Sequence, residues 1–277
     1  MIRANAARYP ISAQCRIPDV PRSTYYWMTG HPGTERADPI AGDVRAVRRD
    51  GRERHGARKI KAALERKGVT ASRRRIGNIM REQGMRARTR ADGPNRTGRG
   101  PTRPGSRTCR TRGSDGYAPH TRPAGDLTYV RVGGDWAYVC LLAGLADRGI
   151  VGHSVGRARD VSLVLGAFAT LDFPLTDVQV FHTDRGGGFD NTRIDEPLDV
   201  FDIKRSLPRR GSSYGSAVVE STNRLLKKEH VYRNHYTTIE QLRRDLNDYV
   251  WWSDNQRLHS TLGYRSPKEF TEQGLVL

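Results

Sequence analysis

Three acidic residues, Asp126, Asp184 and Glu220, occur in sequence contexts that could bring carboxylates to one edge of a sheet. Asp126 begins an alternating strand pattern, Asp184 follows a short apolar strand pattern, and Glu220 lies on a predicted helix. Carboxylates from separate elements can hold two divalent cations about 4 Å apart, as two-metal cleavage of a phosphodiester requires. Hard oxygen ligands favour Mg²⁺, with Mn²⁺ as a substitute. We therefore predict a site for two Mg²⁺ ions formed by these three residues.

Each carboxylate taken singly has a simpler interpretation. Asp126 could be a solvated charge at a strand edge, Asp184 a turn residue ahead of glycines 186–188, and Glu220 a surface residue of a helix. For one isolated acidic residue, the simpler interpretation is the more common one. The prediction therefore depends on the combination and on its spacing, which leaves 220 − 184 − 1 = 35 residues between Asp184 and Glu220.

The elements that must position these acids follow the order of an α/β domain. The predicted strands and helices after position 122 are strands 126–132, 136–143 and 150–155, a helix over 161–171, strands at 178–181 and near 201–204, and helices over about 216–230 and 239–254. Three antiparallel strands, a helix, a parallel strand and further helices are typical of a ribonuclease-H-like domain. We predict this α/β fold, with a mixed five-stranded sheet and covering helices, over residues 123–277.

Residues 1–85 are predicted to form a small all-helical region. A helix after His55 ends at Gly68, and Ser72 is a suitable N-cap for the next helix, which begins with three arginines. Two helices joined by a short turn are typical of a helix-turn-helix, whose second helix can enter a major groove. The predicted DNA-binding residues of this region are Arg58, Arg73, Arg74 and Arg75. A basic helical hairpin without a DNA partner is the alternative.

The charge of the chain also indicates a polyanionic partner. Lys and Arg number 48 against 30 Asp and Glu, a formal net charge of +18, and nucleic acid is the first candidate for so large an excess. A solubilising basic surface is the alternative. Residues 86–122 are rich in Arg, Gly, Pro, Thr and Ser, and we predict a basic flexible linker that either lies along phosphates or only connects two domains.

Other classes of protein fit the sequence poorly. Three cysteines are too few and too scattered for a disulfide framework or a Cys-x-x-Cys zinc site. The amino terminus lacks the apolar stretch of a signal peptide, and the longest apolar run, near 138–146, is too short to cross a bilayer. We predict a soluble cytoplasmic protein without a membrane partner.

The sequence blocks around the acids resemble those of bacterial insertion-sequence transposases of the insertion-sequence-three group. The matching blocks are DLTYV at 126–130, HTDRG at 182–186, ES at 220–221 and LKKE at 226–229, with CRI at 15–17, STYY at 23–26, HGARKI at 55–60 and NQRLHSTLGYRSP at 255–267. The spacing of 35 residues between Asp184 and Glu220 is the one typical of that group. The resemblance thus covers nearly the whole chain.

This resemblance implies an integrase-type catalytic core in which Asp126, Asp184 and Glu220 perform DNA cleavage and strand transfer. Lys227 lies seven residues after Glu220 on the same helix face and resembles the basic residue that contacts terminal phosphates in the family. Arg224 lies between them, and we expect it to bind DNA too. The implied protein is a DDE-type polynucleotidyl transferase that acts in transposition.

The resemblance also implies partners. They are double-stranded DNA at the element ends and at the target, further copies of the chain on that DNA, and the product of an upstream reading frame, because this chain resembles the product of the second frame. We expect a nucleoid-associated location in the cytoplasm.

Several positions depart from the pattern of the group. These are the missing tryptophan in 121–126, Gly144 for an aspartate, Gly187-Gly188 for Ser-Gln, Gly215-Ser216 for Asp-Asn, and Ser253-Asp254 for Tyr-Asn. Residues that support a site hold its geometry, so a catalytically decayed copy that only binds DNA is the first alternative function. A ribonuclease acting on RNA–DNA hybrids is the second.

Four further residues have open or minor roles. Arg257 and His259 either contact DNA or stabilise the last helix, and the sequence does not separate these two roles. We expect Tyr129 to pack in the core or on a strand face and His182 to be a structural neighbour of Asp184.

Overall fold

The computed structural model describes residues 5–30, 38–85, 117–183, 189, 192–206 and 214–277. The chain divides into two compact units, Met1–Arg45 and Ala46–Leu277. The first unit contains α1 (Ile11–Arg16) and α2 (Arg22–Gly30), and α3 (Ala41–Asp50) begins in it. No described helix has both the length and the apolar character needed to cross a membrane.

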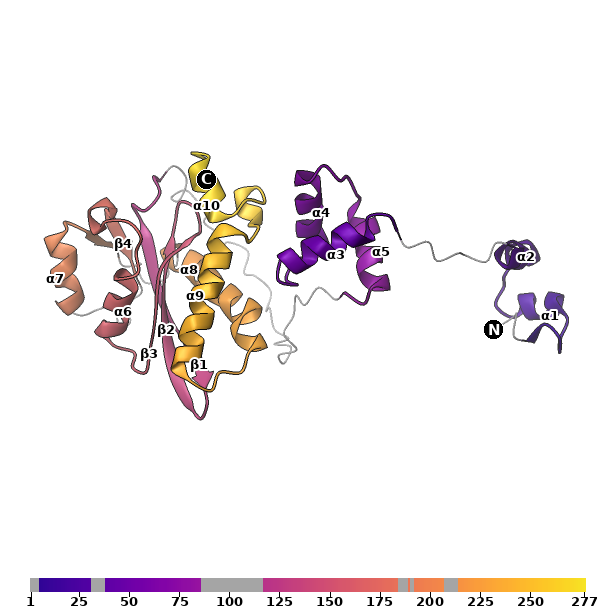
Figure 1. The fold of residues 1–277 in the computed structure, drawn as a ribbon, viewed down its shortest axis with the longest axis horizontal. Coiled ribbons are helices and arrows are strands. Elements are labelled where there is room, and N and C mark those ends of the chain that lie inside the picture. Colours follow the sequence, from indigo (N-terminus) through magenta and orange to yellow (C-terminus); the bar gives the residue numbers. More distant parts are fainter. Residues whose placement is uncertain (1–4, 31–37, 86–116, 184–188, 190–191, 207–213) are drawn as a thin grey trace, which may run out of the picture. The chain divides into compact units, whose positions relative to one another are not determined.

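The helices α4 (Ala57–Arg66) and α5 (Arg73–Glu82) form the predicted turn-linked pair (Figure 1). Gly68 ends the first helix with a positive φ of 78°, where glycine has no steric cost. Ser72 caps the second, because its hydroxyl accepts a hydrogen bond from the Arg75 backbone N–H at 3.1 Å. The buried apolar residues of the pair are Ile60, Leu64, Ile76, Ile79 and Met80.

The second unit contains a mixed five-stranded sheet, as predicted. Its strands are β1 (Pro123–Val132), β2 (Asp135–Gly144), β3 (Ile150–Gly156), β4 (Val180–His182) and β5 (Lys204–Ser206). The strand order is β3-β2-β1-β4-β5. The first three strands pair antiparallel, whereas β4 pairs in parallel with both β1 and β5. The long β1–β2 hairpin therefore lies at the centre of the sheet.

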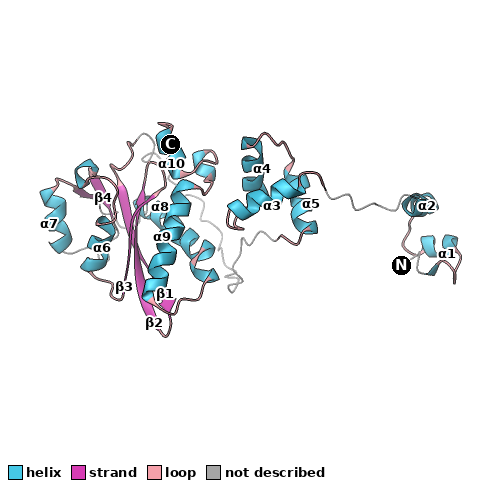
Figure 2. Ribbon diagram, in the orientation of Figure 1, coloured by secondary structure: helices cyan, strands magenta, loops and turns pink. Residues whose placement is uncertain are grey.

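Helices cover both faces of the sheet (Figure 2). They are α6 (Val161–Phe168) and α7 (Thr192–Val200) on one face, and α8 (Tyr214–Glu229) and α9 (Ile239–Asn255) on the other. Neighbouring residues of β2 belong to different cores, since Leu141 packs with α8 and α9 and Leu142 packs with α6 and α7. This alternation is the pleat of a strand buried on both sides.

The structure corrects several predicted boundaries. The helix after Asp160 ends at Phe168 rather than Leu171, β4 ends one residue later than predicted, and β5 begins at Lys204 rather than Phe201. The helix α9 is not the last, because α10 (Pro267–Glu272) follows it. Ser266 and Glu269 form a capping box that starts α10, a signal too local to appear as a hydrophobic period.

Candidate catalytic site and DNA interface

Asp126 lies on the central strand β1, with both carboxylate oxygens hydrogen-bonded. Oδ1 accepts a bond from the Leu127 backbone N–H at 2.8 Å, and Oδ2 accepts one from Asn223 Nδ2 at 2.7 Å. Asn223 is buried on α8. The side-chain bond therefore joins the first predicted acid directly to the helix that carries the third. Sequence reasoning missed Asn223, although its position one turn after Glu220 was a usable signal.

Glu220 lies on α8, three residues before Asn223, with an exposed side chain. Residues three apart on a helix share a face, so Glu220 lies on the same side of α8 as the amide that holds Asp126. Val219 and Leu226 are buried and anchor that helix. The packing leaves the Glu220 side chain exposed to solvent.

Lys227 lies on the same helix, two turns after Glu220, as predicted. Its Nζ lies 4.3 Å from the centroid of the Tyr129 ring. Burial lowers the pKa of Lys227, and the negative charge of Asp126 partly opposes this effect. The ammonium is therefore close enough to Asp126 for their charges to interact. Arg224 is exposed on the intervening turn.

Asp184 lies outside the described residues, so its geometry stays a prediction. The strand before it is described. His182 of β4 pairs with Ala124 of β1, and Thr183 is buried. Burial and the charge of Arg122 lower the pKa of His182, which favours a neutral imidazole. Asp126 and Asp184 each come two residues after this parallel pair.

The predicted DNA-binding arginines of the helix pair lie in two places. Arg73, Arg74 and Arg75 occupy the first turn of α5, Arg58 lies in the first turn of α4, and all four side chains are exposed. The first three thus form an exposed basic turn at the start of the second helix, where a helix-turn-helix reads DNA.

Arg257 was expected either to contact DNA or to stabilise the last predicted helix, and the structure shows a stabilising contact. This residue is only 5% exposed. Its guanidinium donates to both oxygens of Glu229, from Nε at 2.8 Å and from Nη2 at 2.9 Å. Burial, and next the Arg257 charge, lower the pKa of His259 to about 3. Arg257 and His259 thus both belong to a polar cluster in the interior rather than to a solvent-exposed surface.

Tyr129 is not a core residue. It is 55% exposed and makes an edge-to-face contact with Trp136, which is 49% exposed. The alternative expectation, packing on a strand face, is confirmed by this contact. No nucleophilic role is needed for it.

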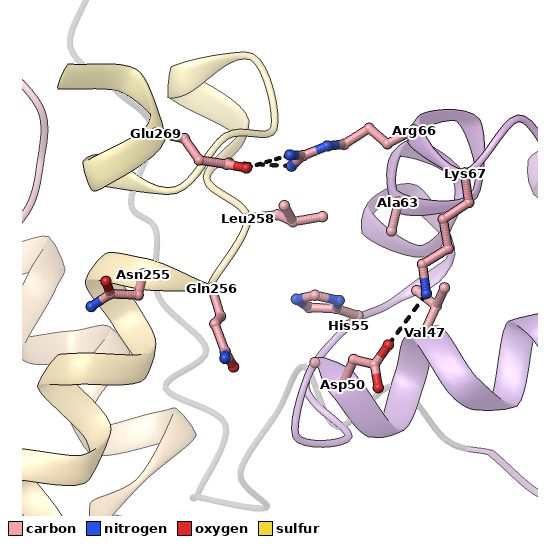
Figure 3. A pocket seen from close by; sticks show the side chains of 11 residues that line it. Val47, Asp50, His55, Ala63, Arg66, Lys67, Asn255, Gln256, Leu258 and Glu269 are labelled. Atoms are coloured by element: carbon pink, nitrogen blue, oxygen red, sulfur yellow. Dashed lines mark hydrogen bonds and ion pairs between the residues drawn. The ribbon is translucent and has the colours of Figure 1, made fainter. Parts of the chain in front are cut away.

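A cavity of about 590 Å³ lies away from these residues, between the α3–α4 region and the segment that includes Gln256 and Glu269 (Figure 3). Arg66 forms an ion pair with Glu269 across it, and Lys67 forms one with Asp50 at 3.4 Å. The rest of its lining is apolar at Val47, Ala63 and Leu258 and polar at His55, Asn255 and Gln256. The cavity contains no group of side chains that matches the predicted chemistry.

The described residues contain no cluster of three or more His, Cys, Asp or Glu side chains able to hold a metal ion. Asp184 is not among those residues. Asp126 and Glu220 supply two carboxylates on facing elements, which is the donor chemistry that Mg²⁺ prefers. These residues therefore fit a hard divalent cation, and the third carboxylate stays a prediction.

The fold and the site together define a protein with an integrase-type catalytic core. A carboxylate lies on the central strand of a mixed sheet, and a second lies on the helix packed across it. The Integrase core domain family matches residues 220–275, and the HTH-like domain family matches residues 35–92.

Comparison with characterised proteins gives the particular group. The chain is 26% identical over 286 residues to the transposase InsF for insertion sequence IS3A of Escherichia coli K12, covering 99% of this chain and 98% of that protein. It is 27% identical over 238 residues to the transposase for insertion sequence element IS904 of Lactococcus lactis IL1403, covering 83% and 92%. The chain is a homologue of IS3-family transposases over nearly its full length.

A similar solved structure is more distant in sequence. A chain of the simian T-cell lymphotropic virus intasome is 17% identical, with a TM-score of 0.48, and the alignment covers 76% of this chain and 70% of that chain. The fold assignment therefore depends on the strand order and on the two matching families.

Proposed function

We propose that this transposase homologue is a DDE-type polynucleotidyl transferase that cleaves DNA at the ends of its insertion element and joins those ends to target DNA. The observation that carries the proposal is the hydrogen bond from Asn223 to Asp126. It couples one carboxylate on the central strand to the helix turn that carries the second, Glu220. The simpler interpretation of Asp126, a solvated charge at a strand edge, does not require a hydrogen bond to a buried side chain.

Asp126, Glu220 and Asp184 are the proposed ligands of two Mg²⁺ ions, with Mn²⁺ as a substitute. When bound, the ions supply activation of the attacking oxygen and charge stabilisation at the leaving oxygen. The parallel pair of Ala124 and His182 supports the placement of Asp184.

The chain's own residues orient the reactants. Asn223 and the Leu127 N–H hold the Asp126 carboxylate in one direction, and Lys227 and Arg224 bind the phosphates of the DNA end. Water first hydrolyses a phosphodiester, which leaves a 3′-hydroxyl. That hydroxyl then attacks a target phosphodiester, forms a new bond and releases a target 3′-hydroxyl. Neither displacement needs a covalent protein–DNA intermediate.

The remaining regions are proposed to bind DNA and partners. Residues 1–85 act as a helical DNA-binding region through Arg58, Arg73, Arg74 and Arg75, residues 86–122 act as a basic linker, and residues 123–277 act as the catalytic core. We expect a homo-oligomer on DNA, association with the upstream reading-frame product, and a nucleoid-associated location in the cytoplasm.

A catalytically decayed copy that only binds DNA is the second candidate. Asp254 favours it, because this carboxyl occupies a position where the group has an amide. Burial raises the pKa of Asp254 to about 8. A buried acid of this kind weakens the packing of α9 against the sheet, and α9 belongs to the same core as α8.

Nicking of a labelled duplex that carries the element's own end tests these two candidates. The protein is supplied as a fusion with the upstream frame, with Mg²⁺ or Mn²⁺. We expect nicking by the wild type, loss of at least about a hundredfold in Glu220→Gln, and no change in Glu240→Gln, an exposed glutamate of α9. Salt-sensitive binding without nicking by the wild type would leave the decayed copy as the function.

A further inference from the structure

An exposed aromatic surface lies at the far end of the β1–β2 hairpin from its β4 partner. Tyr129 and Trp136 make a diagonal cross-strand pair, with ring centroids 5.0 Å apart and planes at 89°. Both side chains are about half exposed, at 55% and 49%. Large aromatic rings normally bury most of their surface. Two neighbouring rings that stay half exposed are therefore typical of a binding surface.

The sheet leaves this part of the hairpin uncovered. On the same strand face, Leu127 and Tyr138, the cross-strand partner of Tyr129, are partly buried against the core beneath α6 and α7. Among the described residues, β4 pairs with β1 at Ala124 alone. Among the residues that the structure describes, the Tyr129 and Trp136 side chains on this face stay about half exposed.

Each ring of the pair is accompanied by a cation. Arg131 is the direct cross-strand neighbour of Trp136, and its guanidinium carbon lies 5.0 Å from the ring centroid. Lys227 Nζ lies 4.3 Å from the Tyr129 centroid. Rings that can stack on bases, next to cations that can pair with phosphates, are the combination found in grooves that bind single-stranded nucleic acid.

The surface is close to the proposed catalytic carboxylate. Tyr129 follows Asp126 by three residues on the same strand, about 10 Å at the rise of an extended chain, and the two side chains leave the strand on opposite faces. Lys227 links the two, because it contacts the Tyr129 ring and its charge interacts with that of Asp126. A DNA strand whose phosphate lies at Asp126 therefore reaches the aromatic rings on the other face of β1 by passing Lys227.

We propose that Tyr129, Trp136, Arg131 and Lys227 form a stacking surface for unpaired nucleotides at the frayed end of the DNA substrate. The proposal rests on the proposed function and adds the conformation of the substrate to it. Stacking on aromatic rings tolerates any base, because every base has a π face. This surface would thus favour an open DNA end over a fully paired one without reading its sequence.

The test compares two duplexes that carry the element's end, one fully paired and one with three unpaired 3′-terminal nucleotides that include 2-aminopurine. Binding is measured in EDTA, so cleavage cannot contribute. We expect the wild type to bind the frayed duplex at least about fivefold more tightly than the paired one and to quench the 2-aminopurine fluorescence. Trp136→Leu and Tyr129→Leu should lose both effects.

Two controls separate stacking from folding. Trp251→Leu removes a tryptophan of α9 that is 54% exposed and should keep the preference and the quenching. Tyr129→Phe keeps the ring and should also keep them. Equal affinity of the wild type for both duplexes, or equal losses in Trp251→Leu, would overturn the proposal.

The metal-dependent nicking assay separates this proposal from the proposed function. Nicking without a preference for frayed ends would remove only the stacking surface. A frayed-end preference in a protein that does not nick would remove only the catalytic function.

Discussion

Arg257 and Glu229 form a two-point ion pair in the interior of the second unit, at 2.8 and 2.9 Å. Glu229 is the last residue of α8, and Arg257 follows α9 by two residues. The pair therefore connects the carboxy-terminal ends of α8 and α9, the two helices that cover the same face of the sheet. Tyr249 donates a further, longer bond to Glu229 at 3.4 Å.

The first prediction concerns the stability that this pair provides. Arg257→Met should lower the free energy of unfolding by about 3–5 kcal/mol, because it leaves Glu229 charged and buried without its main partner. Arg66→Met removes one member of a more exposed ion pair with Glu269 and should cost less than about 1 kcal/mol. Urea unfolding of the three proteins measures the difference. Equal losses in the free energy of unfolding would show that the buried pair stabilises the fold no more than the exposed one.

The pH dependence of the same pair has a definite sign. Burial alone would raise the pKa of Glu229, but the hydrogen-bonded Arg257 guanidinium holds it below its usual range. An acid with a depressed folded pKa stabilises the fold above its unfolded pKa and loses that contribution as the pH falls through the folded value. The wild type should therefore lose more stability than Glu229→Gln as the pH falls below about 4.3, the ordinary pKa of glutamate.

The second prediction concerns Asn223 as a positioning residue. Asn223→Ala removes the donor to Asp126, and we expect the nicking rate to fall by about 10- to 100-fold, with a smaller effect on the affinity for DNA. Asn247→Ala removes a different side-chain amide, one that bonds to His153 at 2.8 Å, and should leave the rate unchanged. A loss confined to DNA affinity would contradict the positioning role.

The third prediction concerns Asp254. Burial raises the pKa of Asp254 to about 8, the bond from the Ile150 N–H at 3.0 Å opposes the shift, and Asp147 and Asp172 add to it. An acid whose folded pKa is raised binds a proton more tightly in the fold, so its contribution to stability is lost as the pH rises towards the folded value. Asp254→Asn keeps an oxygen acceptor and cannot ionise.

We therefore expect Asp254→Asn to be more stable than the wild type, with an advantage that grows by on the order of 1–3 kcal/mol between pH 5.5 and pH 8. Asp177→Asn, which changes an exposed aspartate, is the control. Chemical unfolding at the two pH values gives the comparison. An advantage independent of pH would mean that Asp254 does not titrate in this range.

The fourth prediction concerns the space around Gly144. A Cβ at this position would lie 2.5 Å from Asp147 Oδ1. The Asp147 carboxylate accepts bonds from the Gly149 N–H at 3.0 Å and from Thr271 Oγ1 at 3.1 Å. Gly144→Ala should therefore cost about 1–3 kcal/mol, and less when Asp147→Ala is also present. A double-mutant cycle measures the coupling, and additive costs would contradict it.

Much of the fold was predictable because strand and helix periods are local. The meander of β1, β2 and β3 follows from alternating apolar residues and two turns, and Ser72 marked the start of α5. The short α10 was missed, because its six residues hold too few apolar positions to show a period. The late start of β5 was also missed, because three residues of strand are defined by pairing with β4 rather than by their own pattern.

The sequence by itself determined the class of the protein. The order of its elements, the spacing of Asp126, Asp184 and Glu220, and the excess of positive charge are all properties of the linear chain. Only the tertiary structure decided which polar and aromatic side chains belong to the candidate site, which stabilise the fold and which are exposed. Asn223 holds Asp126, Arg257 stabilises a helix pair instead of facing DNA, and Tyr129 is exposed. The physical reason is that a side chain's role depends on its burial and its partners, and both come from residues far away in the chain.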